Sequence, residues 1–274
     1  MALGNRTLRI LVALISIPIL IAVTYIGKIP FLIFVLFLGL AAYYELVKMG
    51  KHKEINANLP VGVFSIIAII LNAYLSYTPF LILIIAVSST LLITELFRNK
   101  GSAINNLGVS LLGIFYIGLF SSSLINIREF YNTSELVYYE GGYLIIAIFI
   151  SIWVCDSAAY FIGSAVGKHK LFPRVSPNKS WEGAIAGFIF AVVTLIAAHA
   201  LLLDEIAIKD AIVIGIIVGV FGQVGDLVES LLKRDAGVKD SSSIIPGHGG
   251  IFDRFDSILF SAPIIYLYIH FFVQ

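Results

Sequence analysis

Long apolar runs, broken by short polar segments, make up most of the chain. A helix that crosses a bilayer needs about 20 mostly apolar residues, and about nine runs approach this length. They lie near residues 8–27, 30–47, 59–76, 79–97, 106–127, 143–166, 182–203, 210–232 and 257–273. Backbone groups inside a bilayer must be hydrogen-bonded within their own segment, which favours helices. The pattern therefore predicts an all-α polytopic integral membrane protein with about nine transmembrane helices.

The composition supports this prediction. Of the 274 residues, 59% are hydrophobic and 13% are charged, and the mean hydropathy is +0.98. Such a chain has too few polar side chains to cover a soluble globule. The net charge of +1 is uninformative in itself, and we expect no nucleic-acid partner.

The distribution of basic residues predicts the orientation. If the N-terminus is cytoplasmic, the 18 lysine and arginine residues all fall on the cytoplasmic side except Lys28, Arg128 and Lys209. Cytoplasmic loops carry such an excess, so we expect this orientation, with the C-terminus non-cytoplasmic. The expected location is the inner (plasma) membrane of the cell.

Polar residues enter the spans mainly in the second half of the chain. Glu45 and Glu95 lie at cytoplasmic ends of early spans, which we interpret as scaffold. The expected regions are an N-terminal transmembrane scaffold of about four spans (1–100), a middle span with a non-cytoplasmic loop (101–142) and a C-terminal catalytic region of about four spans (143–274).

One late span carries small and charged residues at intervals of three or four: Gly215, Gly219, Gly222, Asp226, Glu229 and Lys233. At about 3.6 residues per turn these six share one helix face. Asp226 lies about 9 Å inside the helix end, where a carboxylate needs a partner. A functional site and a structural salt bridge, with Lys233 or with a basic residue on another helix, are the two interpretations.

A second such face contains Asp156, Tyr160, Gly163 and Gly167. Asp156 lies about 15 Å from the cytoplasmic end of its helix. An acid at that depth indicates function, and a hydrogen bond between packed helices is the alternative.

The loop that follows, GKHKLFPRVSPNKSWEG, is basic and leads into a helix for which Ser180 can serve as the N-cap. Its basic residues are Lys168, Lys170, Arg174 and Lys179. Cations beside a helix N-terminus form an anion site, and phosphate is the obvious anion. The alternative is a loop that only touches anionic lipid headgroups.

The stretch KRDAGVKDSSSIIPGHGGIFDRFD, residues 233–256, is the densest polar cluster. Its lysines and arginines are donors for polyphosphate, and its glycines permit close approach of the backbone to a ligand. Asp253 and Asp256, joined by Asp226 from the preceding helix, would supply hard oxygen ligands. A magnesium–nucleotide site is the prediction, and a solvated loop is the alternative.

The segment SLLKRDAGVKDSSSIIPGHGGIFDRFD resembles the signature of the phosphatidate cytidylyltransferases, and CDSAAYFIGSAVGK and SPNKSWEG resemble further motifs of that family. The resemblance covers roughly residues 150–260. It implies transfer of CMP from CTP to phosphatidate (phosphatidic acid) at the cytoplasmic membrane face, dependent on Mg²⁺, by a homodimer embedded in membrane lipid. Whether a second cation takes part is left open.

The site residues that we expect fall into three groups. The catalytic group is Asp226, Lys233, Arg234, Lys239, His248, Asp253, Arg254 and Asp256. The substrate-binding group is Lys179, Ser180, Asp240, Gly247, Gly249 and Gly250. The metal ligands are Asp226, Asp253 and Asp256, with Asp156 and Glu229 as secondary candidates.

Two other functions use similar residues. An ion-coupled transporter would line its path with intramembrane acids, but such sites lie near the midplane, whereas these polar groups gather at one membrane face. A polyprenol or other lipid kinase would also need nucleotide, metal and lateral entry of its substrate.

Overall fold

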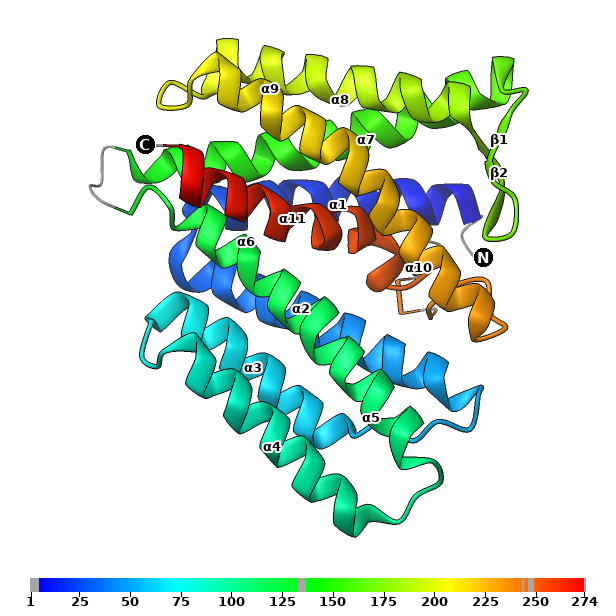
Figure 1. Ribbon diagram of the computed structural model, residues 1–274. Helices are drawn as coiled ribbons and strands as arrows, with labels where there is room; N and C mark the ends of the chain where they lie inside the picture. Colours follow the sequence, from blue (N-terminus) through cyan, green and yellow to red (C-terminus); the bar gives the residue numbers. More distant parts are fainter. Residues whose placement is uncertain (1–4, 133–136, 243, 246–248, 274) are drawn as a thin grey trace. The chain divides into compact units, whose positions relative to one another are not determined.

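The computed structural model describes residues 5–132, 137–242, 244–245 and 249–273 and is largely helical (Figure 1). Each predicted apolar run coincides with a helical segment of the described chain. The segments are α1 (Asn5–Ile26), α2 (Lys28–Lys51), α3 (Leu59–Leu75), α4 (Phe80–Arg98), the continuous α5 (Ala103–Leu112), η1 (Gly113–Leu119) and α6 (Phe120–Arg128), α7 (Tyr138–Val166), α8 (Trp181–Leu202), the continuous α9 (Ile208–Ile217), η2 (Val218–Gly222) and α10 (Gln223–Asp235), and α11 (Phe252–Phe272).

Seven of these segments, within the described residues, are long and apolar enough to cross a membrane: Lys28–Lys51, Phe80–Arg98, Ala103–Arg128, Tyr138–Val166, Trp181–Leu202, Ile208–Asp235 and Phe252–Phe272. Two further apolar helices, Ile10–Ile26 and Leu59–Leu75, are shorter. The protein is therefore a multi-pass, helical membrane protein.

The chain divides into two compact units. Unit 1 consists of the described residues within Met1–Val23, Lys28–Asn126 and Lys233–Phe255, and unit 2 of those within Thr24–Gly27, Ile127–Leu232 and Asp256–Gln274. Both units combine segments that are distant in sequence.

In unit 1, α2, α3, α4 and the α5–η1 segment pack side by side (Figure 1). One part of the core consists of buried aliphatic side chains from α3, α4 and η1: Ile69, Val87, Leu91 and Ile114. The ring of Tyr43 fills the space beside Gly62 and Gly113, where any Cβ would collide with it. Packing of small against large residues thus fixes the spacing of α2, α3 and η1.

In unit 2, α7 packs most extensively on α8, and α8 packs on α9. Gly163 and Gly183 lie where α7 and α8 approach closely: a Cβ on Gly183 would be 3.0 Å from the Cα of Gly163 and 2.6 Å from the carbonyl oxygen of Ala159. Small residues allow such close packing of membrane helices.

A short antiparallel hairpin, which the sequence did not predict, precedes α8 in unit 2. Its strands are β1 (Lys170–Phe172) and β2 (Ser176–Ser180). The hydroxyl oxygen of Ser180 accepts a hydrogen bond from the amide of Gly183 at 3.2 Å, so the prediction that Ser180 caps α8 is confirmed.

The prediction of a single glycine-lined face on the α9–η2–α10 segment is wrong. The π-helical η2 interrupts the α-helical register, because its hydrogen bonds run from residue i to i+5. Gly215 and Gly219 consequently face α8, whereas Gly222 and Gly225 face α11. One helix thus packs closely against two different neighbours.

Candidate active site

Four charged side chains from four elements gather in unit 2. Lys179 on β2 forms an ion pair with Asp226 on α10. Asp256 on α11 is buried and interacts electrostatically with Asp226, with Lys179 and with Asp156 on α7. We call Asp156, Lys179, Asp226 and Asp256 the acid–lysine cluster. The structure thus joins four residues that were predicted from four separate stretches of the sequence.

Local packing positions these side chains. Lys179 directly precedes the N-cap of α8, so the start of that helix fixes its backbone. Gly225 lies against α11, where a Cβ would be 2.6 Å from the carbonyl oxygen of Asp256 and 2.7 Å from the Cβ of Phe260. The close approach of α10 and α11 brings Asp226 and Asp256 within electrostatic range of each other.

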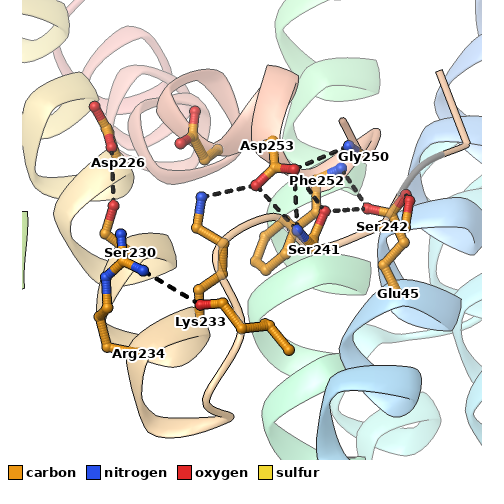
Figure 2. Close-up of polar contacts among 12 residues, drawn as sticks. Glu45, Asp226, Ser230, Lys233, Arg234, Ser241, Ser242, Gly250, Phe252 and Asp253 are labelled. Carbon is orange, nitrogen blue, oxygen red and sulfur yellow. Dashed lines mark hydrogen bonds and ion pairs between the residues drawn. The ribbon is translucent and has the colours of Figure 1, made fainter. Parts of the chain in front are cut away.

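The charges of the acid–lysine cluster do not balance among themselves, since three carboxylates accompany one ammonium group. Two hydrogen bonds offset part of the cost. The amide of Ser257 donates to Asp256 at 2.6 Å. The hydroxyl of Ser230 donates to Asp226 at 3.3 Å, as Figure 2 shows. Glu229, one turn from Asp226 on α10, is also buried. Carboxylate oxygens gathered in this way are the type of ligand that a hard divalent cation such as Mg²⁺ prefers.

A second cluster lies in unit 1, around Asp253 at the start of α11 (Figure 2). The ammonium group of Lys233 is 2.7 Å from the Oδ1 atom of Asp253. The amides of Ser241 and Gly250 donate to its Oδ2 atom at 3.0 Å and 2.9 Å, and the hydroxyl of Ser241 lies 3.0 Å from the same atom. Asp253 therefore organises the segment that leads into α11.

Glu45 on α2 was interpreted from the sequence as scaffold. In the structure it accepts hydrogen bonds from Ser241, Ser242 and Phe252, which Figure 2 labels, and from the amide of Ile251. The one sequence signal for this role is an acid placed between apolar stretches of a span.

The remaining predicted site residues of this region lie in the same signature stretch, residues 230–256. Arg234, Lys239, Asp240 and Arg254 are exposed, and Arg234 donates to the carbonyl of Val238 at 3.4 Å. Gly249 has a φ of +84°, which favours glycine, and its carbonyl accepts from the amide of Ile245 at 2.9 Å. Gly247 and His248 lie outside the described residues.

The profile of the Cytidylyltransferase family matches residues 7–272. The chain belongs to this family. The phosphatidate cytidylyltransferase of Bacillus subtilis (strain 168) is 36% identical over 264 residues, which cover 94% of this chain and 95% of the relative. Those of Staphylococcus haemolyticus (strain JCSC1435) and Staphylococcus aureus (strain COL) are 35% identical, over 94% and 95% of this chain and 96% of each relative.

Both clusters of this cytidylyltransferase family member lie within the matched residues. In the described part of the chain, no three His, Cys, Asp or Glu side chains form a ready-made metal centre. Mg²⁺ does not require three protein ligands, since it is commonly held by one or two carboxylates together with water and substrate phosphates. Asp226 and Asp256 meet this requirement.

Proposed function

We propose that this protein is a phosphatidate cytidylyltransferase, which transfers CMP from CTP to phosphatidate and releases pyrophosphate. The bacterial relatives carry this name and match almost the whole chain. The observation that carries the proposal is the acid–lysine cluster, because phosphate chemistry assisted by a cation needs carboxylates beside a fixed positive charge.

All nine helical segments are proposed to cross the inner membrane, with the N-terminus in the cytoplasm and the C-terminus outside. The excess of lysine and arginine on one side supports this orientation. The signature segment, residues 230–256, would then lie at the cytoplasmic face, where CTP is dissolved. Phosphatidate would enter sideways from the inner leaflet while its acyl chains stay in lipid, and the working form would be a homodimer.

Asp226 and Asp256 are the residues proposed to hold Mg²⁺, with Asp253 as a further predicted ligand. Asp156 and Glu229 are candidates for a second cation. When bound, Mg²⁺ would neutralise phosphate charge and orient the oxygens around the reacting phosphorus. Lys179 would keep Asp226 oriented, since the two form an ion pair.

The reaction needs positioning and charge neutralisation more than covalent chemistry by the protein. A phosphate oxygen of phosphatidate attacks the α-phosphorus of CTP, and a new P–O bond forms. The bond between the α-phosphorus and the oxygen that bridges to the β-phosphate breaks, and pyrophosphate leaves with that electron pair. The proposed phosphate-binding residues are Lys233, Arg234, Lys239 and Arg254, with His248 orienting or protonating a phosphate oxygen.

The test uses purified protein in detergent with phosphatidate, Mg²⁺ and CTP that is labelled at either the α- or the γ-phosphate. Label from the α-position alone in the lipid fraction supports CMP transfer. Label from the γ-position in lipid would instead identify a lipid kinase, and nucleotide-independent ion flux in proteoliposomes would identify a transporter. Asp226→Asn, folded but inactive, is the expected negative control.

A further inference from the structure

Glu45 on α2 is a fully buried acid that is hydrogen-bonded to a segment about 200 positions further along the chain (Figure 2). Its Oε1 atom accepts from the Ser242 hydroxyl at 2.5 Å and from the Ile251 amide at 2.9 Å. Its Oε2 atom accepts from the Ser241 hydroxyl and the Phe252 amide, both at 2.8 Å. One carboxylate thus joins both ends of the segment from Ser241 to Phe252.

These contacts explain why the carboxylate is tolerated without exposure to water. A buried carboxylate is costly unless its oxygens are hydrogen-bonded, and here each oxygen accepts from one hydroxyl and one amide. The amides of Ile251 and Phe252 lie at the start of α11, where the first N–H groups lack partners within the helix and the dipole favours negative charge. Glu45 therefore caps α11 from a distant part of the sequence.

The network continues from Glu45 to Asp253 through Ser241. The Ser241 hydroxyl lies within hydrogen-bond distance of both carboxylates, at 2.8 Å from Glu45 and 3.0 Å from Asp253. A hydroxyl has one proton and donates to one of them at a time. Gly250 packs against the Ser241 hydroxyl and the Glu45 carboxylate. A Cβ at this position would lie 1.9 Å from the hydroxyl oxygen and 2.5 Å from the Oε2 atom of Glu45. A change at Glu45 thus reaches Asp253 through a shared partner.

We infer that Glu45 is a positioning residue for nucleotidyl transfer, which holds Ser241, Ser242 and the start of α11 in their working positions. It acts through Ser241, Ser242 and the amides at the start of α11, not by touching the reacting atoms. The kinetic part of this inference rests on the proposed function. The structural part, in which Glu45 holds Ser241, Ser242 and the start of α11 in place, does not depend on the proposed function. We call this structural role the clamp.

The decisive variant is Glu45→Gln, which keeps the size of the side chain but replaces one acceptor oxygen by an amide donor. That amide must face an N–H or a hydroxyl donor, so part of the network is lost. The expected result is a fall in kcat/KM for CTP of about 10- to 100-fold in protein that remains folded. Glu45→Asp, which retains the charge on a shorter side chain, should recover part of the loss.

Glu95→Gln is the matched control. Glu95 is also buried near the end of a helix in unit 1, and it accepts from Asn106 and Arg98, both at 2.7 Å. These partners lie outside the signature segment. The control should lower the thermal stability and leave kcat/KM per folded molecule within about twofold of the parent, because its network does not reach Asp253.

Hydrogen–deuterium exchange gives a readout that is independent of turnover. Glu45→Gln should accelerate exchange at the amides of Ile251 and Phe252, and Glu95→Gln should not. Parental kcat/KM in Glu45→Gln, or an equal kinetic loss in Glu95→Gln, would overturn the inference. If the unmodified protein transfers no CMP, the proposed function fails, but the structural role of Glu45 can still be tested. Unchanged exchange of the Ile251 and Phe252 amides in Glu45→Gln would then overturn that role, and faster exchange would support it.

Discussion

The ammonium group of Lys179 on β2 is paired with the carboxylate of Asp226 on α10, 47 positions further along the chain. The pair lies beside buried Asp256, which interacts with both residues. Lys179 is therefore the positive charge of the acid–lysine cluster, and its removal would leave three carboxylates close together.

Replacing Lys179 with Met should reduce CMP transfer by on the order of 100-fold, because the orientation of Asp226 and the local charge balance are both lost. The measurement is the rate of CDP-diacylglycerol formation per folded molecule. Lys209→Met is the control, since Lys209 is an exposed residue of α9 in the same unit. Equal losses in both variants would refute a specific role for Lys179.

Removal of divalent cations with EDTA should abolish activity, and added Mg²⁺ should restore it. Asp256→Asn should raise the Mg²⁺ concentration needed for half-maximal activity by about tenfold or more, because one hard oxygen ligand becomes a neutral amide. A titration of rate against free Mg²⁺ measures this shift. Turnover that persists in EDTA would exclude Asp226 and Asp256 as ligands of an essential cation.

Gly183→Ala should lower both stability and activity. The new Cβ would lie 2.6 Å from the carbonyl oxygen of Ala159 and 3.2 Å from the Ser180 hydroxyl, so α7 and α8 must separate. Overpacking of this kind costs about 1–3 kcal/mol. The displacement acts at the N-cap that directly follows Lys179, which links packing to the acid–lysine cluster.

Gly108→Ala is the matched control for that glycine. A Cβ on Gly108, in α5, meets no atom within 4 Å. Alanine should stabilise the helix by up to about 1 kcal/mol and leave turnover unchanged. Thermal melting in detergent, read together with the initial rate, separates the two variants; equal melting temperatures would contradict the close packing at Gly183.

Arg128→Met should destabilise the protein by roughly 3 kcal/mol, because buried Arg128 donates to three backbone carbonyls that would lose their partner. The acceptors are those of Thr24 at 2.7 Å, Tyr25 at 2.8 Å and Tyr138 at 3.0 Å. Arg128→Lys should also destabilise the protein, since an ammonium group lacks the planar array of N–H donors of a guanidinium group. Melting temperature is the measurement, with kcat/KM per folded molecule expected to stay near the parental value.

Local patterns predicted the features that depend on short stretches of chain. Apolar length predicted the helical segments, and a serine before an apolar run predicted the cap of α8 by Ser180. The acids that break apolar runs were found because a charge is costly there. The hairpin at Lys170–Ser180 was missed, since basic and proline-containing loops give no alternating pattern.

The sequence by itself determined that the chain is a helical membrane protein and which residues carry its charge, because both follow from composition and helical spacing. Only the tertiary structure decided the partners: Lys179 for Asp226, Lys233 for Asp253, and Glu45 for the start of α11. Each of these contacts joins residues at least 20 positions apart. Such pairings depend on how helices pack, through close glycine contacts and the π-helical η2, and helical spacing along one segment contains no information about its neighbour.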